Sequence, residues 1–227
     1  MKKPFLTDHQ TFALIILALF IFIGPLFGPV PSFLLKMFDL ELAAILLVIL
    51  FFISFSAIFL IVNNYIRFQK RSIFDLGWRR DTTFKAILLG CLLGVLWSFL
   101  GVGGYLQLNP GVNIFEISFL RIGTVILGCS GAILEDLITR GYVMNELNRF
   151  KISSSLQIVF SSCLFALYHT IWNFNILGFI FSLIYGMLLG GLFIYGRRSL
   201  TPVILGHSLV FLLSEPFLTL FMLESIR

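Results

Sequence analysis

The sequence predicts an all-α protein, a polytopic transmembrane helical bundle with about seven spans, eight as the alternative count, and a cytosolic N-terminus. Of the 227 residues, 59% are hydrophobic and only 12% are charged, and the mean hydropathy is +1.01. Soluble domains have about 45–50% apolar and about 25% charged residues. A bilayer span needs roughly 20 mainly apolar residues, and runs of about that length follow one another along the chain. Disordered, collagen-like and small disulfide-bonded proteins are excluded by this composition.

The spans are predicted from the apolar runs in chain order. They cover residues 12 to about 29, 40–62, 84–105, 114 to about 137, 158–171, 176–195 and 201–223. The first run follows Met1-Lys2-Lys3, as in a signal peptide, but no small-residue cleavage site follows it. We therefore expect an uncleaved span with a bend at Gly24-Pro25. The fifth and sixth runs require a turn near Asn173, and an eighth span would need a break that is not visible in the sequence.

The orientation follows from the distribution of Lys and Arg. With the N-terminus inside, thirteen basic residues lie in cytosolic segments and two lie outside, which is a strong positive-inside pattern. The inside residues are Lys2, Lys3, Arg67, Lys70, Arg71, Arg79, Arg80, Lys85, Arg140, Arg149, Lys151, Arg197 and Arg198, and the outside residues are Lys36 and Arg227. The basic loops therefore predict topology and contact with membrane lipids, and no nucleic-acid partner is expected.

No internal repeat divides the chain, so we interpret it as one domain in two parts. Residues 1–73 form N-terminal transmembrane helices with a basic cytosolic loop, and residues 74–227 form the core that carries the candidate site. The short chain without sorting signals predicts an integral protein of a bacterial inner membrane.

Ionisable residues within apolar spans are costly and mark functional sites by default. Asp136 and Arg140 are spaced i,i+4, so one helix face can hold them as an ion pair. Glu135 is rotated by about 100° from Asp136 and is left free of that pair. Two adjacent acids in different environments can take different roles, one neutralised by Arg and one available for chemistry.

Two histidines lie in later spans. Phe165 precedes His169 by one helical turn and can shield and orient the imidazole. His207 lies five residues beyond Pro202, which suits the first turn of a helix, and Gly206 allows a close backbone approach beside it. Two His and one uncompensated Glu from three helices are typical of a water activated by a metal or by a base.

These three segments resemble the CAAX-protease and bacteriocin-processing (CPBP, Abi-like) family of intramembrane metalloproteases. The family pattern is Glu-Glu-x-x-x-Arg, then Phe-x-x-x-His, then His-x-x-x-Asn, and the resemblance covers about residues 74–215. The matching residues here are Glu135, Asp136 and Arg140, then Phe165 and His169, then His207 and Phe211.

The resemblance implies an endopeptidase that cleaves near the C-terminus or a membrane-proximal part of a peptide or lipid-anchored protein. Glu135 and His169 would activate the attacking water, and Arg140 would hold the helix through Asp136. His207 would stabilise the oxyanion or ligate a metal. The resemblance leaves open whether a divalent metal such as zinc is bound; Glu135, His169 and His207 are its candidate ligands, and no other cofactor is implied.

Two departures from the pattern bear on activity. Asp136 replaces the second Glu and keeps its charge, whereas Phe211 replaces the final Asn and offers no hydrogen-bond donor. An amide aimed at an oxyanion can contribute roughly 2.7–4 kcal/mol; Asn173 is a hypothetical substitute. The alternative function is therefore a catalytically impaired relative that acts as a membrane scaffold, immunity factor or regulator.

A minor alternative is a rhomboid-like serine protease. Ser130 lies in a Gly-x-Ser-Gly segment, His207 could act as its base, and His169 with Asn173 matches an oxyanion element, although in the wrong order. Arg121 and Glu215 have no place in any of these mechanisms, and structural pairing is the interpretation we give them.

Overall fold

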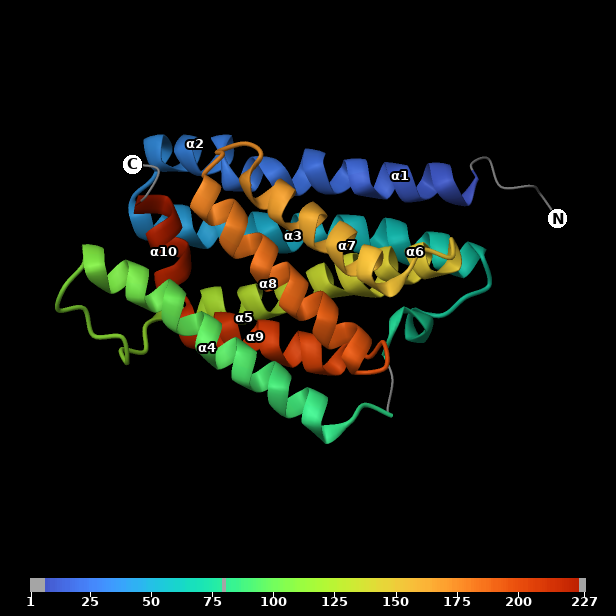
Figure 1. The fold of residues 1–227 in the computed structure, drawn as a ribbon. Helices are drawn as coiled ribbons and strands as arrows, with labels where there is room; N and C mark the ends of the chain where they lie inside the picture. The colour runs from blue at the N-terminus through green and yellow to red at the C-terminus, as the bar shows by residue number, and fades with distance from the viewer. Residues whose placement is uncertain (1–6, 79–80, 225–227) are drawn as a thin grey trace.

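The computed structural model describes residues 7–78 and 81–224, and every regular element in these ranges is helical (Figure 1). The α-helices are α1 (Asp8–Ala18), α2 (Pro29–Met37), α3 (Leu40–Phe68), α4 (Phe84–Leu108), α5 (Phe119–Asp136), α6 (Asn145–Arg149), α7 (Ser154–Thr170), α8 (Ile176–Tyr195), α9 (Thr201–Ser214) and α10 (Phe217–Glu224). Short 3-10 or π segments are η1 (Leu19–Ile23), η2 (Gly24–Phe27), η3 (Ile73–Leu76) and η4 (Leu137–Met144). The all-α prediction is confirmed. Of the predicted basic residues, Lys2, Lys3, Arg79, Arg80 and Arg227 lie outside the described ranges.

The long helices begin where a polar side chain can accept a backbone N–H. Asp39, Thr83 and Ser118 are the N-caps of α3, α4 and α5, and each side chain accepts a backbone N–H from the first turn. Such a cap satisfies a donor that has no partner within the helix. Asn175 does the same for α8, which begins at the predicted position after the turn near Asn173.

Within the described residues, five helical segments are long and apolar enough to cross a membrane. They are Asp8–Met37, Leu40–Phe68, Phe84–Leu108, Phe119–Arg149 and Ile176–Tyr195. The pair α9 and α10 is a sixth candidate, bent by 72° at its break. The 17-residue helix α7 corresponds to the predicted span 158–171. About seven helical segments therefore match the predicted spans.

Three predicted spans have different limits in the structure. The first continues beyond Gly24-Pro25 through a 3-10 turn into α2, so the helical segment is longer than predicted. The fourth continues as a π-helix and α6 to Arg149. The last is broken at Pro216, because proline lacks a backbone N–H and disfavours helical backbone in the residue before it.

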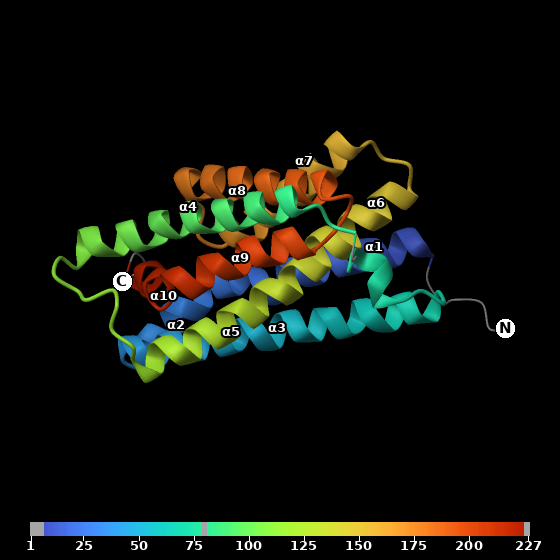
Figure 2. The same ribbon diagram turned by 90° about the horizontal axis from the view of Figure 1, so that it is seen from below.

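The helix α9, which carries His207, lies between α4 and α5 (Figure 2). Small residues at every fourth position of α4 face it: Ala86, Gly90, Gly94 and Ser98 are all buried. A Cβ on Gly206 would lie 2.6 Å from the Gly90 carbonyl oxygen. The close backbone approach predicted at Gly206 is therefore present, and small residues allow it, as in other membrane helix pairs.

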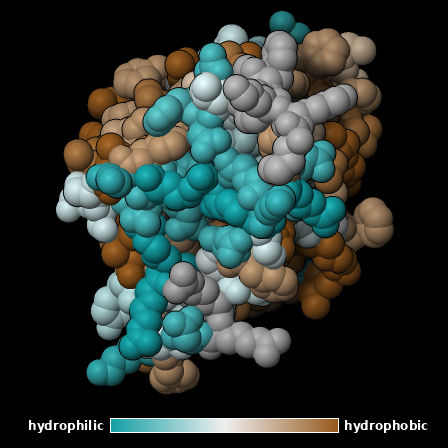
Figure 3. Space-filling view, turned by 90° about the vertical axis from the view of Figure 1, so that its right-hand side faces the viewer, coloured by the Kyte–Doolittle hydropathy of each residue, from teal (hydrophilic) through white to brown (hydrophobic). Residues whose placement is uncertain are grey.

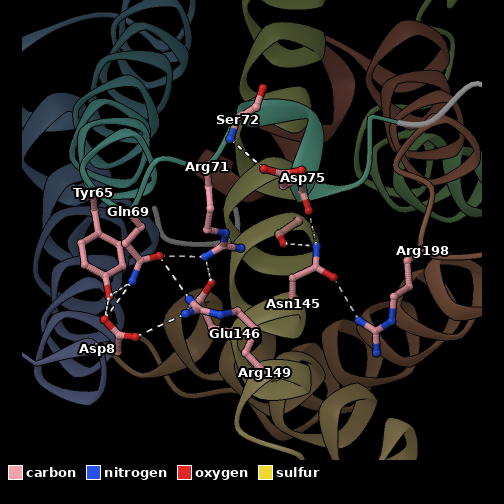
Figure 4. Close-up of polar contacts among 11 residues, drawn as sticks. Asp8, Tyr65, Gln69, Arg71, Ser72, Asp75, Asn145, Glu146, Arg149 and Arg198 are labelled. Carbon is pink, nitrogen blue, oxygen red and sulfur yellow. Dashed lines mark hydrogen bonds and ion pairs between the residues drawn. The ribbon is translucent and has the colours of Figure 1, made fainter.

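Polar side chains gather at one end of the bundle, where α6 and the loop after α3 meet. In the end-on view, hydrophilic residues cover the centre of this end and hydrophobic residues lie at its rim (Figure 3). The positive-inside rule predicts that this end is the cytosolic one. Its central group is Glu146, 1% exposed, which binds Arg71 at 2.5 Å and Arg149 at 2.7 Å (Figure 4). Arg149 also reaches Asp8 of α1 at 3.3 Å, so the network joins α1, α6 and the loop.

We expect Glu146→Gln to lower the free energy of unfolding by about 1–3 kcal/mol, because two guanidinium groups lose a buried charged partner. Thermal unfolding in detergent measures the effect. Glu116→Gln is the matched control, since Glu116 is exposed in the loop before α5. Equal melting temperatures for the two variants would contradict the interpretation.

Candidate active site

Glu135 and Asp136 end α5, at the point where the helix changes to the π-helical segment η4. Arg140 in η4 binds Asp136, with Nη1 3.1 Å from Oδ1. The same nitrogen donates to the Thr139 hydroxyl at 2.7 Å. The predicted ion pair is therefore present, and Glu135 is outside it. Short π-helical turns often occur at functional sites, because they change the direction of side chains along a helix.

Asp136 also reaches across the bundle to His207. Its Oδ2 lies 3.1 Å from His207 Nδ1, whereas Oδ1 accepts from Arg140. A carboxylate in this position fixes the imidazole with Nε2 directed away from it. Asp136 therefore positions His207 as well as pairing with Arg140, a second role that the spacing in the sequence did not reveal.

Arg140 is fully buried within the candidate span Phe119–Arg149, so the prediction that it lies in a loop after the fourth span was wrong. Its guanidinium lies over the Phe165 ring, 4.6 Å from the centroid. The helix continues to Arg149, which lies at the polar end, because η4 and α6 extend α5 without a break. Glu135 lies before η4 and α6, which lead to Arg149 at the polar end, and His169 lies near the far end of α7, 4.0 Å from Glu135. Both groups therefore reach the same depth.

His169 lies at the end of α7 and is held by Phe165 one turn earlier. Its Nδ1 is 2.7 Å from the Phe165 carbonyl oxygen, and the two rings are 4.2 Å apart. Because a carbonyl oxygen can only accept, Nδ1 carries the hydrogen and Nε2 is left as an acceptor. The centroid of the Phe27 ring of η2 lies 4.2 Å from that of the His169 ring. His169 keeps 18% of its side chain exposed, more than Glu135 or His207.

Glu135 lies between the two imidazoles. His169 Nε2 is 4.0 Å from Glu135 Oε1, and His207 Nε2 is 3.9 Å from Oε2. These separations are too long for direct hydrogen bonds. A water molecule can bridge a histidine Nε2 and a Glu135 carboxylate oxygen that are about 4 Å apart. It then forms a hydrogen bond of about 2.8 Å to each atom, with an angle near 90° between the two bonds. The site can therefore hold a water molecule between the Glu135 carboxylate and His169 Nε2, which is a second hydrogen-bond acceptor.

The described residues contain no group of three or more His, Cys, Asp or Glu arranged to hold a metal ion. The two imidazoles face different oxygens of Glu135, and one of these oxygens also accepts the Tyr168 hydroxyl. Zinc needs its ligands about 2.0–2.2 Å from one centre. Glu135, His169 and His207 as they stand do not fit this requirement, and we derive no chemical step through a metal.

Three aromatic residues near the site were not predicted. Tyr168 donates its hydroxyl to Glu135, Phe27 packs on His169, and the Tyr185 ring lies 5.5 Å from that of His207. A buried tyrosine in an apolar span needs a hydrogen-bond partner, and this need was a usable signal for Tyr168, which directly precedes His169. Phe27 and Tyr185 come from distant helices, and no sequence spacing relates them to the site.

Phe211 replaces the expected Asn beside His207, and Asn173 is its hypothetical substitute. The Phe211 ring is 5.4 Å from His207 and packs against Gly128, where a Cβ would lie 2.7 Å from Phe211 Cδ1. Asn173 is exposed in the turn after α7, and its backbone N–H donates to the Thr170 carbonyl. In the described part of the chain, no side-chain contact joins Asn173 to the site.

The remaining polar residues of the spans have local partners. Ser130 donates to the Ile126 carbonyl one turn earlier at 2.8 Å, and His207 faces Asp136 and Glu135. Arg121 binds the backbone carbonyls of Ile114 and Glu116. Glu215 accepts from Thr219 at 2.8 Å. The described ion pairs include none between Arg121 and Glu215, so each has its own structural contact.

An all-helical bundle with apolar spans, and with buried Glu and His side chains meeting at its centre, defines an integral membrane protein with a candidate active site. Residues 117–213 match the family model of the Rce1-like type II CAAX prenyl endopeptidases. The matched segment contains the Glu135, His169 and His207 motifs, so the resemblance to the CAAX protease family is confirmed there. No curated protein and no solved structure matches the chain.

Proposed function

We propose that the protein is an intramembrane endopeptidase that uses Glu135 and His169 to activate a water molecule. The observation that carries the proposal is the convergence of Glu135, His169 and His207 from α5, α7 and α9, with separations of 3.9 and 4.0 Å. Each imidazole is held through Nδ1, so both Nε2 atoms are directed towards Glu135. This orientation favours a site built for chemistry over a set of unrelated buried polar residues.

In the proposed reaction, the Glu135 carboxylate takes a proton from water, and the water oxygen attacks the peptide carbonyl carbon. His169 Nε2 accepts the second hydrogen of the water and orients it. Asp136 stabilises an imidazolium form of His207, whose Nε2–H can then donate to the oxyanion. Glu135 returns its proton to the leaving nitrogen as the C–N bond breaks. The products are a carboxylic acid and an amine, and the atoms of peptide and water balance.

The substrate we propose is a peptide or lipid-anchored protein cleaved near its C-terminus or beside the membrane. The name of the matched family supports a prenylated C-terminal tail, and bacteriocin processing is the other possibility that the wider family offers. A bacterial inner membrane is the proposed location, and membrane lipids surround the exposed apolar faces of the helices.

The test is cleavage of a fluorogenic peptide library, prenylated and plain, by the protein in proteoliposomes. Wild-type cleavage that Glu135→Ala abolishes supports the proposal. If wild type and variant are both silent while an active member of the family cleaves in parallel, the endopeptidase proposal is wrong.

The second candidate function is a membrane scaffold, immunity factor or regulator derived from such an enzyme. Phe211 favours it, because a phenyl ring lies 5.4 Å from His207 and offers no donor to an oxyanion. Under this hypothesis the protein binds a partner without cleaving it, and Glu135→Ala leaves that binding unchanged.

A further inference from the structure

Tyr185 of α8 brings to the site a hydroxyl group that the proposed reaction has not used. Tyr185 is 4% exposed, the same as Glu135 and His207. Its Oη has no hydrogen-bond partner among the described residues. Burying a hydroxyl without a partner costs free energy. A phenylalanine could fill the same apolar space without that cost, so the hydroxyl needs an explanation.

The Tyr185 ring is fixed from two sides. It stacks on Trp97 of α4 at 4.7 Å and 19°, and it meets the His207 ring edge-on at 5.5 Å and 76°. It also lies 6.3 Å from the Phe165 ring, over which the Arg140 guanidinium is placed. Packing therefore holds the Tyr185 ring beside His207, whose imidazole faces both Asp136 and Glu135.

The expected amide donor is missing from the neighbouring position. Phe211 follows His207 by one turn on α9, where the family pattern has Asn, and its ring packs towards Gly128 of α5. Tyr185 approaches the same imidazole from α8. A phenol O–H is a hydrogen-bond donor, and a preorganised donor aimed at developing charge is what an oxyanion requires.

We propose that Tyr185 donates a hydrogen bond to the oxyanion of the tetrahedral intermediate, in the role that the family's amide would have at position 211. The inference rests on the proposed endopeptidase function. The hydroxyl keeps its proton throughout and forms no covalent bond. Tyr185 is thereby a catalytic residue, and its partner is present only during the reaction, which accounts for a buried hydroxyl without one in the resting protein.

The test compares kcat and KM of Tyr185→Phe with wild type on the library peptide that wild type cleaves fastest. We expect kcat to fall by about 10²-fold or more while KM changes by less than about twofold, because the lost bond forms only in the transition state. A peptidyl phosphinate of the same sequence, which carries a tetrahedral oxyanion, should bind Tyr185→Phe more weakly by a similar factor.

Tyr142→Phe is the matched control. Tyr142 is also buried and its hydroxyl also lacks a partner among the described residues, but its ring faces Phe12 and Tyr65. Removing that hydroxyl should leave kcat unchanged. Phe211→Asn supplies the second arm: with an amide restored, Tyr185→Phe should cost less than about 10-fold, since either donor can serve.

The outcomes separate this inference from the proposed function. If wild type cleaves and Glu135→Ala does not, but Tyr185→Phe stays within about threefold of wild-type kcat, the Tyr185 role is wrong and the endopeptidase stands. If Tyr185→Phe lowers kcat equally in the wild-type and the Phe211→Asn backgrounds, Tyr185 has a structural role instead. If wild type cleaves no peptide, both proposals are wrong.

Discussion

Replacement of Glu135 by Gln is expected to lower kcat for peptide cleavage by about 10⁴-fold, the upper end of what a general base contributes. The amide is nearly the same size as the carboxylate, and its carbonyl oxygen can still accept the Tyr168 hydroxyl. The packing between His169 and His207 is therefore retained. What is lost is the ability to take a proton from water, so the effect should appear in kcat rather than in stability.

Glu215→Gln is the control for this variant. Glu215 is also a buried acid within an apolar segment, 1% exposed, and its partner is Thr219 rather than a histidine. Its replacement should leave kcat unchanged in the same proteoliposome assay. His169→Ala should lose about as much activity as Glu135→Gln, and the double variant little more, because residues that act on one water are not additive. Full activity in Glu135→Gln would remove Glu135 from the mechanism.

Much of the fold was predictable because the bilayer limits a chain of this composition to helices of known length. The start of α8 at residue 176 and the Asp136–Arg140 pair both follow from local patterns, apolar run length and i,i+4 spacing. The close approach at Gly206 likewise depends on the residue type. Local rules of this kind need no knowledge of which helices are neighbours.

The errors occurred where a residue's depth or partner depends on distant helices. Arg140 was placed in the segment after the fourth span because charged residues normally end a span, but Asp136, Thr139 and the Phe165 ring accommodate it inside the bundle. Tertiary partners of this kind leave no periodic signal. The contact between Tyr185 and His207 joins α8 to α9 through side-chain packing alone, and it is equally invisible in the sequence.

The contact between α4 and α9 should be the most sensitive position for stability. We expect Gly94→Leu to lower the free energy of unfolding by about 3 kcal/mol or more, because overpacking forces backbones apart. A Cβ on Gly94 would lie 2.9 Å from the Leu209 Cβ and closer still to the Gly206 carbonyl oxygen. Neither atom lies at the end of a flexible side chain, so relief requires α9 to move.

That movement should also reach the site. His207 directly follows Gly206, and its Nε2 lies 3.9 Å from Glu135, so protein that remains folded should show a lower kcat. A misplacement of about 1 Å can cost about 10²-fold. Gly103→Leu is the matched control on the same helix, because a Cβ there meets no atom within 4 Å. Thermal unfolding in detergent compares the two variants. Equal melting temperatures for Gly94→Leu and Gly103→Leu would show that the packing of α4 and α9 does not depend on close backbone contact. If only Gly94→Leu has a lower melting temperature, and its folded fraction also has a lower kcat, the contact between α4 and α9 positions His207 opposite Glu135.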